Sequence, residues 1–170
     1  MSDVFLIAPE GADVARALAQ FPARALLLLR GDGDYAAWVR AVAPLAQKAS
    51  VAVLVEGEPA DVKALGADGL HVTDGSAAIA AAVKALKPQF IVGAAGISSR
   101  DDAMSFGEAG VDYVFFGPIS GSIDLRTREL ARWWAETMEV PSVLSDPEAT
   151  DASAESEGCE FIGLGHAAWR

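Results

Sequence analysis

Leu65-Gly-Ala-Asp-Gly-Leu-His-Val72 is the first of three similar stretches, and it has relatives at Ala109–Phe116 and Glu157–Leu164. In each stretch a glycine suits the left-handed residue that ends a helix, a short acidic turn comes next, and strand-forming residues follow. The three glycines are 44 and 48 residues apart, which corresponds to two βα units of roughly 22 residues each. The spacing therefore predicts a repeated βα architecture.

Eight short apolar runs fill this pattern. Continuous apolar runs are typical of parallel strands that are buried on both faces. The predicted strands are Val4–Ala8, Ala25–Leu29, Val51–Val55, Gly69–Val72, Phe90–Ala94, Tyr113–Phe116, Ser142–Leu144 and Phe161–Leu164. Helices are predicted at Asp13–Gln20, Tyr35–Lys48, Ala60–Leu65, Ala77–Leu86, Arg100–Ala109 and Leu125–Met138. Strict alternation over eight units predicts an α/β fold, a compact (β/α)8 TIM barrel in one domain over residues 1–170, in preference to an open doubly wound sheet.

The final two helices are expected to be reduced. The seventh would come from Asp146–Glu157, where a proline and several Ser, Thr and Asp residues make a poor helix, and the eighth has only Ala167–Arg170. One side of the barrel would then be thinly covered, and apolar surface there would suit a second copy in a homodimer. Trp133, Trp134 and Trp169 are candidates for that contact, for covering the gap, or for ordinary packing of helices on the barrel.

Composition limits the classes of partner. The chain has 24 acidic and 13 basic residues, for a net charge of -11, so we expect neither nucleic acid nor a membrane surface as a partner. The only cysteine, Cys159, excludes an intramolecular disulfide. The N-terminus lacks the features of a signal peptide, and no apolar run approaches the roughly 20 residues of a membrane span. These observations predict a cytoplasmic protein.

In a barrel of this type the ligand site lies in the loops after the strands. Arg30 is the only basic residue at such a strand end, which makes it a candidate for binding an anion; a salt bridge to Glu56 or Asp32 is the alternative. The loop after the sixth strand can present backbone N–H groups to a phosphate. The phosphate-binding candidates in this loop and in the last loop are Gly117, Ser120, Gly121, Ser122 and Gly165.

Acidic and histidine side chains on the same loops suggest further roles, although none is assigned a catalytic step. Oxygen ligands on adjacent loops make Mg²⁺ a possible cofactor, with Glu56 and Asp74 as candidate ligands, but an acidic protein also scatters carboxylates on loops without binding metal. His71 and His166 follow or end strands, and each can act as an acid or base or merely pack.

At these loops the chain resembles the thiamine phosphate synthase/TenI superfamily. Ala64–His71 resembles the family pattern "(V/A)GADG(V/I)HLGQ", and Glu108–Ile119 resembles "EAGADYIGVGPIF". Ile91-Val-Gly-Ala-Ala95 is similar to the family's "IIGVS", and Leu26–Arg30 to the "QLR" of strand two. The resemblance implies a barrel that joins a pyrimidine pyrophosphate to a thiazole phosphate, with Mg²⁺ holding the pyrophosphate leaving group.

Several family motifs are altered in this chain. The "REK" after strand two becomes Arg30-Gly31-Asp32, and the "ND" after strand three becomes Glu56-Gly57. The "GQED" after strand four becomes residues 73–76, so the family's second metal carboxylate is either absent or displaced to Asp74. The "GGI" phosphate turn after strand seven becomes Ser145-Asp146-Pro147. The remaining changes fall at Ala95, Pro118, Ser122 and Leu125, where the family has a serine, the TenI histidine, a threonine and a lysine.

The altered motifs leave three hypotheses. The one we favour is a diverged paralogue that binds a small ligand, possibly phosphorylated, at the carboxyl-end face of the barrel with the magnesium–pyrophosphate site eroded. The second is an active thiamine phosphate synthase, a transferase in which other carboxylates replace the missing ligands. The third is a non-catalytic scaffold.

Overall fold

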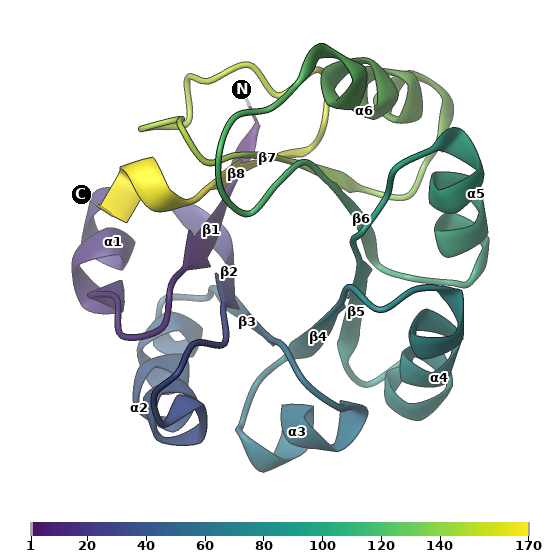
Figure 1. Cartoon of the computed structure of the whole chain (residues 1–170). Helices are drawn as coiled ribbons and strands as arrows, with labels where there is room; N and C mark the ends of the chain where they lie inside the picture. The colour runs from purple at the N-terminus through teal and green to yellow at the C-terminus, as the bar shows by residue number, and fades with distance from the viewer. Residues whose placement is uncertain (1, 170) are drawn as a thin grey trace.

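Strand β1 (Asp3–Ala8) pairs with both β2 and β8, and this double pairing closes the sheet. The computed structural model describes residues 2–169, in which eight parallel strands follow one another around a closed barrel in chain order (Figure 1). The other strands are β2 (Ala23–Leu28), β3 (Ala52–Val55), β4 (Gly69–Val72), β5 (Ile91–Ala94), β6 (Tyr113–Phe116), β7 (Ser142–Asp146) and β8 (Phe161–Leu164). The predicted TIM barrel is confirmed, and each predicted strand has its counterpart.

Six α-helices alternate with the first seven strands and pack outside the ring. They are α1 (Val14–Gln20), α2 (Tyr35–Lys48), α3 (Pro59–Ala64), α4 (Ser76–Leu86), α5 (Arg100–Glu108) and α6 (Leu125–Thr137). Side-chain caps fix several of their starts: Asp34 accepts the N–H of Ala37, and Ser99 that of Asp102. No helix in residues 2–169 is both long and apolar enough to cross a membrane.

The segment between β7 and β8 differs from the prediction because it forms no helix at all. Residues 147–160 run as turns and bends, and Asp146, the expected helix start, is the last residue of β7. Asp and Ser side chains bond locally to backbone N–H groups here, as when Asp151 accepts the N–H of Ser153, and such bonds compete with a helix. After β8 a short 3-10 helix, η1 (His166–Trp169), stands in place of the expected eighth helix, whose last residue, Arg170, lies outside the described residues. Figure 1 shows this side of the ring covered by loop and by η1 alone.

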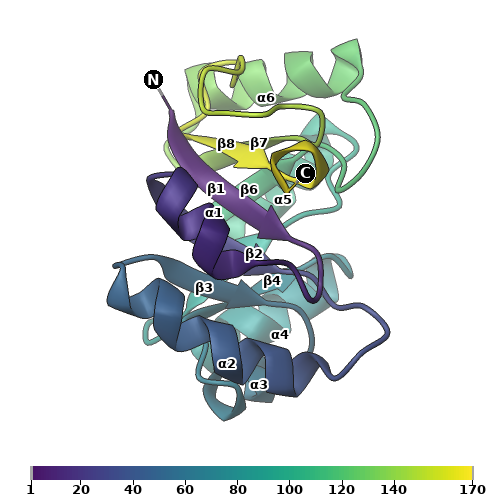
Figure 2. The same cartoon turned by 90° about the vertical axis from the view of Figure 1, so that its left-hand side faces the viewer.

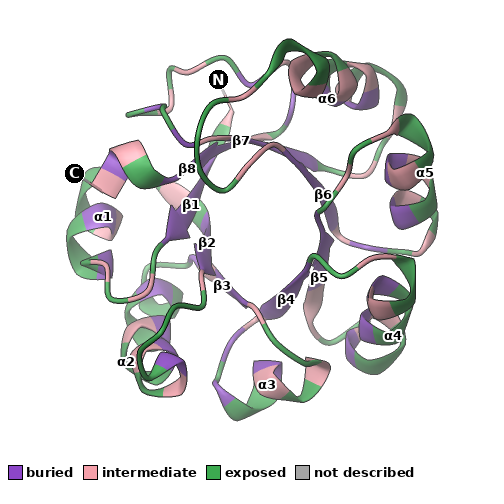
Figure 3. Ribbon diagram, in the orientation of Figure 1, coloured by how far each residue is buried: buried purple, intermediate pink, exposed green. Residues whose placement is uncertain are grey.

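Side chains alternate between two apolar layers along every strand. One large core lies between the strands and the helices, and a smaller one fills the barrel. Figure 3 shows the strands buried along most of their length. In β4, Leu70 and Val72 belong to the outer core, whereas His71 contacts the aromatic rings of Tyr113 and Phe115 inside the barrel. The strands are buried on both faces, as their continuous apolar runs predicted.

Glycine makes room for a large ring inside the barrel. A Cβ at Gly93 would lie 1.8 Å from the ring of Tyr113, so Tyr113 lies across a position where no side chain is tolerated. Tyr113 in turn contacts Phe5 edge to face, with ring centroids 5.4 Å apart. The interior is therefore a packed aromatic core, and the ligand site must lie above it.

The three tryptophans named in the sequence analysis all pack against their own chain. Trp134 is buried and donates its indole N–H to the carbonyl oxygen of Val140. Trp169, in η1, donates to the carbonyl oxygen of Ile7 at 2.7 Å. Trp133 lies under the guanidinium of Arg100, 4.6 Å from the ring centroid. Trp169 thus fastens η1 over β1, and the homodimer stays a prediction.

Candidate functional site

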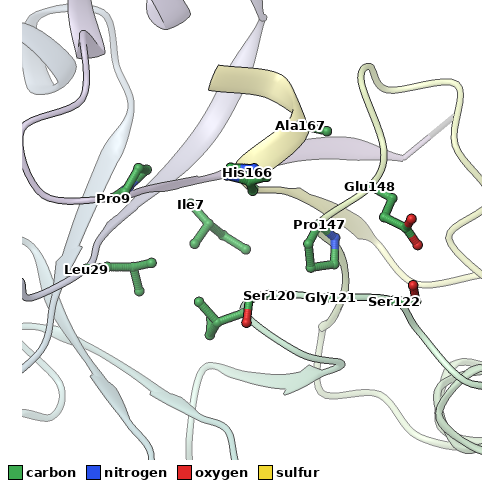
Figure 4. Close-up of a pocket in the computed structure, with 12 residues that line it drawn as sticks. Ile7, Pro9, Leu29, Ser120, Gly121, Ser122, Pro147, Glu148, His166 and Ala167 are labelled. Carbon is green, nitrogen blue, oxygen red and sulfur yellow. The ribbon is translucent and has the colours of Figure 1, made fainter. Parts of the chain in front are cut away.

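The carboxyl ends of the strands meet at one mouth of the barrel, from which the loops after β1 and β2 project in Figure 2. A pocket of about 580 Å³ opens at this mouth. Figure 4 shows the side chains around it, which come from the end of β1 and from the loops after β1, β2, β6, β7 and β8. Its apolar lining consists of Ile7, Pro9, Leu29, Ile119, Pro147 and Ala167.

Polar groups complete the pocket. Ser120, Gly121 and Ser122 come from the loop between β6 and α6, which reaches over the barrel toward β1 and β8 in Figure 1. His166 comes from the start of η1, and Glu148 follows β7. The structure therefore brings together five of the predicted residues, namely Ser120, Gly121, Ser122, Gly165 and His166.

Gly117, predicted in the same loop, does not line this pocket. Its φ is +103°, and a Cβ there would lie 2.6 Å from the carbonyl oxygen of Ser145. The hydroxyl of Ser145 donates to the carbonyl oxygen of Pro118 at 2.7 Å. Gly117 therefore holds the loop close to β7, so that its role is to position the serines beyond it.

Arg30 lies apart from these serines, in a second pocket at the ends of β3 and β4. Glu56 and Asp74 line this pocket too, and so does His71, whose ring however lies inside the barrel against Tyr113 and Phe115. The Arg30 guanidinium lies 4.3 Å from the ring centroid of Tyr35 and donates to the carbonyl oxygen of Glu56 at 3.0 Å. The Arg30 guanidinium thus bonds to the Glu56 backbone. The alternative expected from the sequence, a salt bridge to the carboxylate of Glu56 or Asp32, is not formed.

Tyr35 supports that arrangement from below. Its hydroxyl donates to the carbonyl oxygen of Leu28 and accepts the N–H of Glu56 at 3.1 Å. Burial raises the pKa of Tyr35 to about 12, so the hydroxyl stays protonated at neutral pH. The ring therefore joins the ends of β2 and β3 under Arg30.

Glu10 is the site residue that sequence reasoning missed. Its carboxylate accepts the N–H of Gly31 at 3.0 Å and that of Gly33 at 2.6 Å, while the Glu56 carboxylate accepts the N–H of Arg30 at 2.7 Å. A Cβ at Gly33 would lie 2.6 Å from the Glu10 carboxylate, so glycine lets the acid approach. The Gly-x-Gly pattern at 31–33 was the available signal, because such turns can hold an anion on their amides. Here the anion belongs to the protein.

His71 lies in the interior below the mouth and is 3% exposed. Its Nδ1 is 2.7 Å from the Tyr113 hydroxyl, and its Nε2 has no hydrogen-bond partner in the structure. Burial lowers the pKa of His71 to about 4, because the apolar surroundings disfavour the charged form. The ring is therefore neutral at physiological pH, and it packs within the aromatic core.

The described carboxylates form no cluster that would hold magnesium by protein ligands alone. Within residues 2–169 no group of three or more His, Cys, Asp or Glu side chains is arranged to hold a metal ion. Glu56 and Asp74 line the same pocket, but Glu56 already accepts the N–H of Arg30. A magnesium ion at this pocket would need further oxygen ligands from a substrate or from water.

Comparison with known proteins decides the family. The family model described as thiamine monophosphate synthase matches residues 12–145. The chain belongs to the thiamine monophosphate synthase family. The thiamine-phosphate synthase of Erythrobacter litoralis is 32% identical over 70% of this chain and 60% of its own length. That of Hyphomonas neptunium is 32% identical over 76% and 62%, respectively.

The chain therefore spans about 60% of the length of these synthases. Among solved structures, a thiamine phosphate pyrophosphorylase from Pyrococcus furiosus superposes with a TM-score of 0.72 at 18% identity, over 95% of this chain and 84% of that one. An HpcH/HpaI aldolase from Desulfitobacterium hafniense gives the same TM-score and identity, over 98% and 87%. Likeness at such identity shows the shared barrel, and family membership rests on the sequence matches.

Proposed function

We propose that this member of the thiamine monophosphate synthase family is a diverged paralogue that binds a small ligand at the mouth of the barrel and does not form thiamine phosphate. The observation that carries the proposal is the loop after β2. Its backbone N–H groups at Arg30, Gly31 and Gly33 are bonded to carboxylates of the chain itself. By resemblance, this loop corresponds to the family's "REK", of which the chain keeps the arginine as Arg30 and lacks the lysine, since Asp32 stands in its place.

Electrostatics explains why this arrangement opposes the family reaction. A pyrophosphate leaving group needs cations and N–H donors aimed at its developing charge. Here the Glu10 and Glu56 carboxylates hold the donors, and like charge repels the incoming phosphates. The Arg30 guanidinium is stacked on Tyr35 and bonded to a backbone carbonyl. Reaction at this loop would require several of these contacts to break.

The pocket with Ser120, Ser122 and His166 supports the ligand-binding half of the proposal. It combines an apolar lining with a few polar groups, which is the usual character of a small-molecule site. Its position above the strand ends is where barrels of this type bind their ligands. We propose further that the protein is located in the cytoplasm and that it forms a homodimer.

The decisive experiment is an assay for thiamine phosphate formation from the pyrimidine pyrophosphate and the thiazole phosphate with Mg²⁺ present. An active thiamine-phosphate synthase serves as the positive control in the same buffer. We expect no product above background at micromolar concentrations of this protein. Steady turnover that scales with protein concentration would refute the proposal.

Such turnover would instead support the second candidate function, an active synthase, which the names of the sequence relatives favour.

A further inference from the structure

The charges around the mouth pocket differ from those of a phosphate site. Glu148 is the only Asp, Glu, Lys or Arg side chain among its lining residues, and His166 is the only other side chain there that can carry charge. Both are exposed at the rim. The fixed charge that a ligand meets in this pocket is therefore negative.

Two arginines lie near the pocket, and both already bind to other groups of the protein. Arg128 pairs with Asp146, which directly precedes Pro147 of the lining, at 3.7 Å, and also with Glu157. Arg16 donates to the carbonyl oxygen of Trp169, at the end of η1. Neither arginine lines the pocket. Among the described lining residues there is therefore no Lys or Arg side chain to neutralise a phosphate.

Backbone donors after β7 are also unavailable. Pro147 has no N–H, the N–H of Glu148 bonds to the Asp146 carboxylate, and that of Ala149 bonds to the Asp146 carbonyl oxygen. After β8 the N–H of Ala167 bonds to the Pro147 carbonyl oxygen. The loops after the seventh and eighth strands commonly form the phosphate site in these barrels. Here the N–H groups of Glu148 and Ala149 after β7, and those of Ala167 and Ala168 after β8, are bonded within the protein.

The rest of the pocket suits an apolar ring. Ile7 and Leu29 belong to the inner core or pack against it, and Pro9 and Ile119 add apolar surface beside them. The hydroxyls of Ser120 and Ser122 can bond to a neutral polar group as well as to an anion. Because the serine hydroxyls do not discriminate between a neutral group and an anion, the Glu148 carboxylate determines which sign of charge is favoured on the ligand.

We infer that the mouth pocket takes an unphosphorylated organic cation with an apolar ring, its charge placed toward Glu148 and its ring over Ile7 and Leu29. The inference rests on the proposed function and names the ligand class of the same site. A phosphate group would approach the Glu148 carboxylate with like charge and would find few free donors after β7.

The test compares thiamine, which is a cation, with thiamine monophosphate, which differs only by the added phosphate. Isothermal titration calorimetry of the full chain at low ionic strength gives both affinities, and amide chemical shifts of Gly121 and Gly165 locate the binding. We expect thiamine to bind about tenfold more tightly than its monophosphate. Glu148→Gln should weaken thiamine binding about threefold, and Glu148→Lys should remove the preference.

Glu139→Gln is the matched control, because it removes one exposed negative charge next to β7 at the opposite end of the barrel. It should leave the preference intact, so an equal loss in both variants would assign the effect to net charge and overturn the inference. Equal or tighter binding of the monophosphate would also overturn it, while leaving ligand binding at the mouth in place. Binding of neither compound would overturn both the inference and the ligand-binding half of the proposed function; the turnover assay tests the other half separately.

Discussion

The carboxylate of Glu10 accepts the backbone N–H of Gly33 at 2.6 Å, across 23 residues of sequence. A second bond to the N–H of Gly31, at 3.0 Å, makes the contact bidentate. The protein thereby places its own anion on the loop that the family resemblance assigns to substrate. This relationship links the local glycine pattern to the loss of anion binding that we propose.

Removing the Glu10 carboxylate should uncover the loop. Glu10→Ala frees two N–H donors beside Arg30, so inorganic phosphate should raise the melting temperature of the variant and leave that of the parent protein unchanged. The lost bonds should also reduce the free energy of unfolding by about 1 kcal/mol without ligand. Differential scanning fluorimetry measures both effects, with phosphate added up to about 20 mM, a range suited to a weak site.

Glu139→Ala controls for general relief of acidic repulsion, since Glu139 is exposed and lies away from the loop. A phosphate response of equal size in both variants would show that Glu10 has no special place on the loop.

His71 should make stability depend on pH. Its pKa lies at about 4 in the folded protein against 6.5 ordinarily, so between these values the unfolded chain binds the proton more readily. Stability is therefore unaffected by this residue above pH 6.5, falls as pH drops toward 4, and changes no further below it. The full loss is on the order of 3 kcal/mol. Urea unfolding at half-unit steps of pH across this window measures it.

His71→Gln keeps a polar partner for Tyr113 but cannot titrate, so it should flatten this part of the curve. His166→Gln is the control, because it makes the same substitution at an exposed histidine outside the aromatic core. Parallel curves for His71→Gln and the parent protein would contradict the assignment.

Gly93→Ala should be severely destabilising. The added Cβ would lie 1.8 Å from the Tyr113 ring, and moving that ring disturbs the aromatic core. We expect a loss of about 3 kcal/mol or more. Gly66→Ala is the matched control, since Gly66 has a φ of +73° but open space around its Cβ position, so only backbone strain of about 1 kcal/mol applies. Chemical denaturation of both variants compares them.

A smaller side chain at position 113 should rescue the first variant in part. The double variant Gly93→Ala/Tyr113→Leu should lose less stability than the sum of its single changes. Strict additivity would mean that the clash with Tyr113 is not the cause.

Tyr35→Phe tests the support beneath Arg30. The change keeps the ring under the guanidinium but leaves the carbonyl of Leu28 and the N–H of Glu56 without their partner. A loss of about 1 to 3 kcal/mol in the free energy of unfolding is expected, because these groups lie around a buried hydroxyl. Guanidinium denaturation followed by circular dichroism measures the loss, and a change below about 0.5 kcal/mol would argue that water replaces the hydroxyl.

The sequence by itself determined the barrel, through glycine-ended repeats and apolar runs whose periodicity is local. Helices α2 and α4 begin and end within one residue of their predicted limits, since capping and amphipathic spacing act within a few residues. Family membership also came from short motifs such as Ala64–His71.

Only the tertiary structure decided how the candidate residues group. It placed Arg30 and Ser120 in different pockets, paired His71 with Tyr113 across 42 residues, and brought Glu10 to Gly31 and Gly33. Each of these contacts depends on which way a side chain points once the sheet has closed. Local spacing carries no information on that direction for residues in irregular loops, because their backbone angles have no fixed period.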